Sequence, residues 1–154
     1  MSSTAVRNAI SSFITTTFPT EKLVDVTAEP TDLEELLEDA GVSMATFDPW
    51  LATQFIGADE IPITVPATNT EGQQRETGAF AIHAVEKSAL GVVNRIQPRL
   101  EAIRNAFRNQ RIGAILILSV APPNYSTGAT LDLSGGYTSG TVLISYEYTF
   151  SLPV

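Results

Sequence analysis

The chain has no cysteine among its 154 residues. This absence excludes disulfides, thiolate metal ligands and cysteine nucleophiles, and it fits a reducing compartment. Charged residues are scarce as well, at 17% of the sequence, whereas the hydrophobic content of 44% is ordinary for a globular protein. A low charge content leaves neutral surface, which suits a protein that buries much of itself against partners.

Long hydrophobic runs are also missing. No apolar stretch approaches the roughly 20 residues of a membrane-spanning helix. The polar segment Met1–Ala5 leads directly into an amphipathic pattern, so we do not expect a signal peptide or a membrane partner. A chain of this length is typical of one domain with one core, and we expect a single domain over residues 1–154.

Positive charge is in short supply. Nine Lys and Arg residues stand against 17 Asp and Glu residues, which gives a formal net charge of -8. An acidic protein gains no affinity for DNA by releasing counterions from phosphates. We therefore expect no tight nucleic-acid binding, although DNA could pass along a surface that repels it.

The sequence offers few residues for catalysis. His83 is the only histidine, and it lies in an apolar strand pattern that favours a packed side chain over a general base. No spacing resembles a metal site or a phosphate-binding loop, so we predict no catalytic, cofactor-binding or metal-binding residue. One enzymatic alternative stays open, in which two carboxylates among Asp59, Glu60 and Glu86 converge in a cleft.

The hydrophobic periodicity predicts helices, strands and turns along the whole chain. We expect a helix over 3–17, a strand over 23–26, a helix over 31–40 that begins with a capping box, strands over 50–56 and 61–65 separated by a turn or bulge at 57–60, a strand over 79–86, a helix over 94–109 and a strand over 112–121 buried on both faces. This order predicts an α+β fold: a single layer of mostly antiparallel mixed β-sheet, packed on one face by two or three helices and ending in a β-hairpin.

The last segment carries the clearest strand pattern. Its alternation puts five large apolar side chains on one face, namely Val142, Ile144, Tyr146, Tyr148 and Phe150. Glu147 and Thr149 lie on the other face, where a neighbouring molecule could bind. A short strand at 131–133 and a turn built from Gly135, Gly136 and Gly140 would complete the hairpin.

Residues 67–78 show no apolar periodicity, which predicts a long mobile loop. Its mixed tip, formed by Gln73, Gln74, Arg75 and Glu76, is a candidate contact with another molecule. The alternative is a plain hairpin connection.

Five arginines flank the apolar stripe of the 94–109 helix, which we expect to be buried and which consists of Val93, Ile96, Leu100, Ile103 and Phe107. Arg95 and Arg99 lie along one edge of the stripe, and Arg104, Arg108 and Arg111 lie along the other. Their stems could cover apolar side chains while their heads stay in water. Alternatively, their guanidinium groups could bind the acidic residues concentrated at 21–76 of a neighbouring subunit. Pairing with the 31–40 helix of the same chain would look identical in sequence.

The acidic cluster of the 31–40 helix also has two interpretations. Glu34, Glu35, Glu38 and Asp39 could form a solvated face beside buried leucines. They could instead form an acidic wall that faces DNA or a basic partner.

The order of these elements resembles the tail terminator proteins of long-tailed bacteriophages, which are minor tail proteins. The resemblance rests on the N-terminal amphipathic helix, the Trp50–Ile56 strand, the polar segment ending at Arg75–Gly78, the Ala79–Val85 strand, the helix ending in Phe107 and the Gly-rich terminal segment. It covers most of residues 3–150 as an element order, and the 31–40 helix looks like an insertion.

The resemblance implies a virion structural protein without catalytic residues or cofactors. Such proteins form a ring, usually a hexamer, that caps the tail tube, stops its polymerisation and offers a docking surface to the head connector or neck protein. DNA passes through the centre without specific binding. The protein would be assembled in the host cytoplasm and would lie at the head-proximal end of the tail.

On this hypothesis the candidate interface residues are Gln73, Gln74, Arg75, Glu76, Arg104, Arg108, Arg111 and Glu147. Two other functions stay open. The first is a head–tail joining or neck protein, which can share the same layered fold. The second is a small acidic module that binds a ligand or a protein as a monomer.

Overall fold

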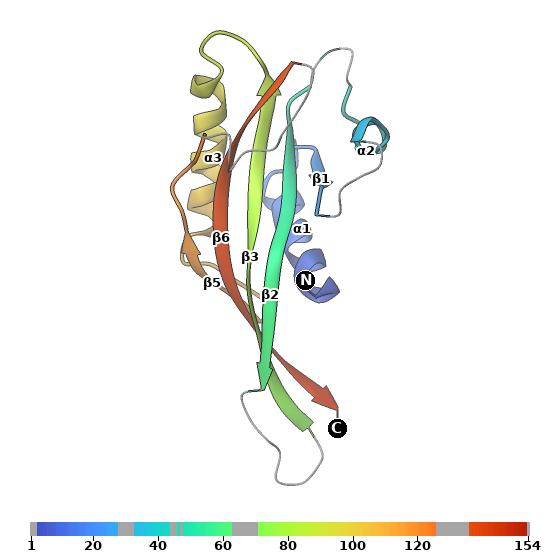
Figure 1. The fold of residues 1–154 in the computed structure, drawn as a ribbon, viewed down its shortest axis with the longest axis vertical. Helices are drawn as coiled ribbons and strands as arrows, with labels where there is room; N and C mark the ends of the chain where they lie inside the picture. Colours follow the sequence, from blue (N-terminus) through green and yellow to red (C-terminus); the bar gives the residue numbers. More distant parts are fainter. Residues whose placement is uncertain are drawn as a thin grey trace.

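The computed structural model describes residues 3–27, 33–43, 46, 48–62, 71–125 and 136–153 (Figure 1). The elements in chain order are α1 (Thr4–Thr17), β1 (Leu23–Asp25), α2 (Leu33–Asp39), β2 (Trp50–Pro62), β3 (Glu71–Lys87), α3 (Val93–Phe107), β4 (Arg111–Ile112), β5 (Ile115–Val120) and β6 (Tyr137–Pro153). The six strands form one sheet in the order β1-β2-β3-β6-β5-β4. Among the strands of the described residues, only the β1–β2 pair is parallel, so the predicted α+β fold with a mostly antiparallel mixed sheet is confirmed.

Two of the three helices share one face of the sheet. Apolar side chains of α1 and α3 pack in a single buried cluster against inward-facing residues of β2, β3, β5 and β6. Phe13 of α1 and Phe80 of β3 both make edge-on ring contacts with Phe107 of α3. We call this side of the sheet the helical face.

The third helix, α2, packs on the opposite face. Its Leu37 is 1% exposed and belongs to a second buried cluster with Trp50, Ala52 and Val85. Trp50 and Ala52 flank Leu51, which belongs to the first cluster, and successive strand residues point to opposite faces. The expected capping box at 31–34 begins outside the described residues.

The first helix begins and ends as the sequence predicts. Ser3 caps its N-terminus by accepting a hydrogen bond from the Val6 backbone N–H at 3.4 Å. Val6, Ile10 and Ile14 lie one helical turn apart and are buried, which holds α1 against the sheet.

The predicted burial of the 94–109 helix is corrected at one end. Ile96, Leu100, Ile103 and Phe107 are buried as expected, but Val93 is 41% exposed. The first turn of α3 starts at Val93, so the preceding Val92 takes the buried position at its N-cap.

The strand expected over 112–121 also differs in the structure. Gly113, with a φ of 60°, turns the chain between β4 and β5, and Leu118 is 53% exposed, so β5 is buried on only one face.

The terminal strand is longer than predicted and contains no turn at Gly140. β6 runs unbroken from Tyr137 to Pro153 and pairs with β3 along its whole length. Gly140 lies within this strand. The position favours glycine because a Cβ there would come within 2.8 Å of the side chains of Leu100 and Tyr125. The partner strand expected at 131–133 falls outside the described residues. Val142, Ile144 and Tyr146 are fully buried, as predicted.

The predicted loop over 67–78 is wrong in its second half. Residues 71–78 belong to β3 and pair with both β2 and β6, whereas 67–70 lie outside the described residues. Residues 71–78 lack an apolar period because none of them belongs to a hydrophobic cluster of the core, so their strand structure leaves no hydrophobic pattern in the sequence. Similarly, β2 continues through 57–60, with a bulge between Phe55 and Gly57 where a bulge or turn was expected.

The lower parts of β2, β3 and β6 extend beyond the helices as a three-stranded projection (Figure 1). We call residues 57–62, 71–77 and 147–153 the sheet arm. Five of the eight candidate interface residues lie in the arm, at one end of the molecule: Gln73, Gln74, Arg75, Glu76 and Glu147.

Candidate functional site

A buried carboxylate fixes the base of the sheet arm. Glu76 is 4% exposed and faces the helical side of β3. Its Oε2 accepts a hydrogen bond from the Tyr146 hydroxyl at 2.6 Å, and its Oε1 accepts one from the Ser3 backbone N–H at 3.1 Å. The carboxylate therefore joins β3 to β6 and to the N-terminus of α1, where a negative charge is favoured by the helix dipole.

The backbone packs tightly beside this carboxylate. A Cβ on Gly78 would lie 2.5 Å from the Gly57 carbonyl oxygen and 2.8 Å from the Tyr146 hydroxyl. No side chain fits at that distance, so glycine is needed where the β2 bulge approaches β3. The bulge, Gly78 and the Glu76–Tyr146 hydrogen bond thus form one packed unit at the root of the arm.

The four residues predicted at a loop tip do not share one surface. Gln73 is exposed and Gln74 is half-buried, with alternating directions along β3. Arg75 lies 3.9 Å from Glu147 of β6 in an ion pair across the sheet. The expectation that Glu76 lies at an exposed loop tip is wrong, because Glu76 is buried in β3 and both its oxygens accept hydrogen bonds within this chain.

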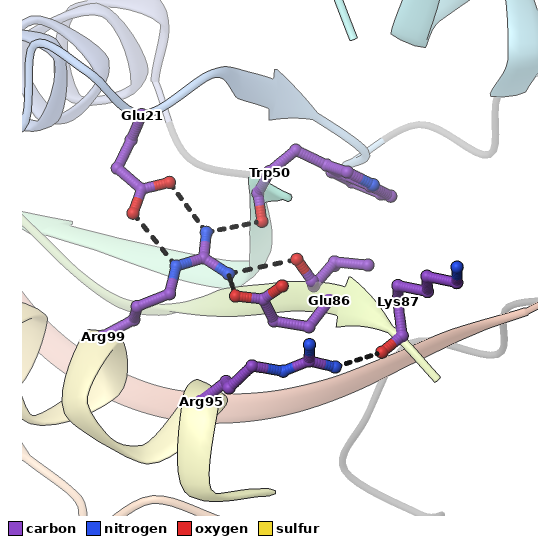
Figure 2. Close-up of polar contacts among 7 residues, drawn as sticks. Glu21, Trp50, Glu86, Lys87, Arg95 and Arg99 are labelled. Carbon is purple, nitrogen blue, oxygen red and sulfur yellow. Dashed lines mark hydrogen bonds and ion pairs between the residues drawn. The ribbon is translucent and has the colours of Figure 1, made fainter. Parts of the chain in front are cut away.

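Arg99 connects four segments of the same chain (Figure 2). Its Nε and Nη2 donate to the two oxygens of Glu21, at 3.0 and 2.7 Å, in a bidentate pair. Nη1 donates to the Val85 carbonyl at 3.0 Å and lies 3.5 Å from Glu86, and Nη2 also reaches the Trp50 carbonyl at 3.1 Å. The Arg99 side chain is 15% exposed, so these contacts are largely shielded from water.

The other arginines in and after α3 do not share the multiple contacts of Arg99. Arg95 donates to the Lys87 carbonyl at 2.9 Å (Figure 2), and Arg104 lies 4.0 Å from Glu101. Arg108 and Arg111 are exposed at the end of α3 and in β4. Pairing within the chain thus accounts for Arg99, although its partners are Glu21 and Glu86 and not the 31–40 helix.

Charge is unevenly distributed between the two sides of the sheet. Arg108 and Arg111 lie at the β4 edge. The β2 side carries Asp59 and Glu60, exposed in the lower part of that strand, and the exposed acidic residues of α2, which packs in one cluster with Val24 of β1; the α2 residues are Glu34, Glu35, Glu38 and Asp39. Figure 1 places α2 and α3 on opposite sides of the sheet, in agreement with the strand order. One flank of the molecule is therefore basic and the other acidic.

The single histidine is buried on the face opposite the helical face. His83 is 2% exposed, its Nδ1 lies 2.7 Å from the Thr141 hydroxyl and its Nε2 lies 3.0 Å from Gln54 Oε1. Gln54 accepts at Oε1, so Nε2 carries a proton and Nδ1 accepts from Thr141. Burial lowers the pKa of His83 from 6.5 to about 4, because the charged ring would lose its hydration.

The three carboxylates considered for an enzyme do not gather. The Glu86 carboxylate forms an ion pair with Arg99. Asp59 and Glu60 are adjacent in β2, so their side chains point to opposite faces of the sheet. Within the described residues, no group of three or more His, Cys, Asp or Glu side chains is arranged to hold a metal ion.

Several structural contacts have only weak signals in the sequence. Glu76 lies two and four residues before Gly78 and Phe80 on the same strand face, so period-2 counting beyond the expected loop would have placed it toward the core. Glu21 has no such signal, because its contact with Arg99 joins residues 78 positions apart.

Comparison of the sequence with known protein families and with curated proteins gave no match. In the described part of the chain, no helix is both long and apolar enough to cross a membrane.

Replacing Arg99 with Met should destabilise the fold. The substitution leaves Glu21, Glu86 and two carbonyl oxygens without a partner, and breaking such a shielded pair costs about 3 kcal/mol. Urea unfolding followed by circular dichroism measures the loss. Arg95→Met is the matched control, since Arg95 is exposed and donates to the Lys87 carbonyl, and it should cost less than about 1 kcal/mol. Equal losses in the two variants would contradict this role of Arg99.

Tyr146→Phe should also lower stability, by about 1–3 kcal/mol, because a buried oxygen of Glu76 loses its donor. Tyr148→Phe removes a hydroxyl from the next inward position of β6 and serves as the control. In a double-mutant cycle, Tyr146→Phe combined with Glu76→Met should cost less than the sum of the two single changes. Additive losses would show that the two side chains are not coupled.

The free energy of unfolding should decrease as the pH is lowered, because of His83. Its pKa in the folded state lies below that in the unfolded state, so the stabilisation is complete above pH 6.5 and is lost as the pH falls toward 4. The shift corresponds to about 3 kcal/mol over that interval. His83→Gln should remove this part of the pH dependence, measured as the difference in unfolding free energy between pH 7 and pH 4. An unchanged difference would rule out His83 as its source.

Proposed function

We propose that this protein is a virion structural protein, a tail terminator of a long-tailed bacteriophage that forms a ring on the tail tube. The ring stops polymerisation of the tube and offers its other face to the head connector. The protein acts through surfaces and not through a catalytic centre.

The observation that carries this proposal is the difference between the two flanks of the sheet. Arg108 and Arg111 are exposed at one edge, and Asp59 and Glu60 are exposed at the other. Two unlike, complementary patches on opposite flanks favour head-to-tail association, and head-to-tail contacts with a suitable rotation close into rings.

The sheet arm adds support for contact with a stacked partner. It extends beyond the helices, so its faces and edges are available to a molecule that approaches from that end (Figure 1). The net charge of -8 agrees with a channel through which DNA passes without being gripped.

The proposal is tested by mixing the purified protein with polymerising tail tube protein. Electron microscopy should show rings of the protein alone and, in the mixture, shorter tubes with a ring at one end than tube protein forms by itself. A protein that forms no rings and leaves tube lengths unchanged would refute the proposal. Rings that bind the head connector but never a tube would instead favour a head–tail joining protein.

A further inference from the structure

One row of paired residues crosses the sheet from edge to edge. Arg111 of β4 pairs with Leu116 of β5, which pairs with Glu147 of β6. Glu147 pairs with Thr77 of β3, and Thr77 pairs with Asp59 of β2. Directly paired residues point to the same face of a sheet, so Arg111 and Asp59 mark the two ends of one row on one face.

Within the described residues, no further strand pairs beyond either end of this row. β4 is the last strand of the sheet on its side. On the other side, β1 pairs with β2 only at 51–53, and no strand of the described residues pairs with the outer edge of β2 below the bulge. Edge strands expose unpaired backbone groups and side chains to an approaching molecule.

The two ends are complementary in charge. Arg111 is exposed, and Arg108 precedes it by three residues at the end of α3. Asp59 and Glu60 are exposed at the opposite end. Each end therefore carries a pair of like charges, and the two pairs are opposite in sign.

Exposed apolar side chains accompany both ends. Ile56 and Ile61 of β2 are 58% and 45% exposed and lie on either side of Asp59 along the strand. Leu118 of β5 is 53% exposed on the other flank. Apolar side chains ringed by charge are typical of surfaces that bind another protein.

We propose that the β4 edge of one molecule binds the β2 edge of a second copy, with Arg111 opposite Asp59. The proposal rests on the ring proposed above and specifies its interface. Rotation about an axis along the strands keeps every residue at its own height, so the two ends of the row meet without a shift. A contact of β4 with β4 would instead bring Arg108 and Arg111 against their own copies.

Side chains must supply most of this contact. β4 spans only Arg111–Ile112, too short for an extended backbone ladder to a neighbouring strand. An exposed ion pair alone contributes little, whereas like charges forced together are strongly unfavourable. Charge reversal is therefore a sharper test than removal of the charges.

The experiment compares three variants with the wild-type protein by analytical ultracentrifugation and native mass spectrometry. The first is Arg108→Glu with Arg111→Glu, the second is Asp59→Lys with Glu60→Lys, and the third carries all four changes. Either two-residue variant alone should raise the dissociation constant for self-association by about tenfold or more, since each now places like charges at the contact. The four-residue variant should associate like the wild type, and so should an equimolar mixture of the first two.

The matched control is Lys87→Glu, which makes the same kind of charge change at the opposite end of β3 and should leave association unaffected. Circular dichroism melts confirm that each variant is folded. Weak association in both two-residue variants without rescue in the mixture or in the four-residue variant would overturn the pairing, as would unchanged association in all of them.

The same proteins separate this interface from the proposed function. Rings that form and respond to the charge swap but do not shorten tail tubes would refute the terminator role and leave the interface standing. Rings that cap tubes but are indifferent to the swap would refute the interface and leave the role standing. A wild-type protein that stays monomeric would refute the interface directly.

Discussion

The pairing of β3 with β6 is the constraint on which the remaining structure depends. Both strands are 17 residues long and pair from Glu71–Pro153 at one end to Lys87–Tyr137 at the other. The other strands attach to this ribbon directly or through a neighbouring strand. β2 adds to one side and β5 to the other, and α1 and α3 cover one face of its upper part. Because the register of this pair decides which side chains face the helices, a shift of β6 by one residue would turn Val142, Ile144 and Tyr146 away from them.

Two polar contacts join this ribbon to the helices, one near its upper end and one at the root of the arm. At the upper end, Arg99 joins α3 to the start of β2, the end of β3 and the segment after α1. At the root of the arm, Glu76 joins β3 to Tyr146 and to the start of α1. Both groups are ionisable and mostly shielded, and each is matched by several partners, as buried charge requires. The helices are therefore positioned by polar contacts as well as by the apolar cluster between them.

The sequence predicts the elements that bury a regular apolar stripe, and misses those that do not. The sequence predicts the ends of α1 and α3 to within two residues, because Val6, Ile10 and Ile14 repeat at helical spacing and Leu100 and Phe107 do the same. The sequence does not reveal the arm, because Gln73 to Arg75 carry no apolar period and their strand partners in β6 lie 74 to 78 positions away. Propensity and periodicity are local, whereas this pairing is set by the whole sheet.

The candidate interface shows the same division between local and distant information. Arg108 and Arg111 were recognised from their spacing along the chain, but Asp59 was considered only as half of a catalytic pair. Only the register across five strands shows that Asp59 and Arg111 lie in one row. Glu76 was assigned to an exposed tip, and its burial follows from a tyrosine and a helix start that sequence spacing does not connect to it.

The bulge between Phe55 and Gly57 determines which residues of the arm face each side of the sheet. Upstream of the bulge, the odd-numbered residues of β2 face the helices, as Leu51 and Phe55 do; downstream the parity is reversed, and Asp59 points to the other side. The surface chemistry of the arm is thus set by a count of residues as much as by their identities. Loss of the codon for Ile56, the extra residue of the bulge, would make the ladder regular and leave Asp59 opposite Thr77, whereas loss of a codon between the bulge and Asp59 would exchange the faces of Asp59 and Glu60.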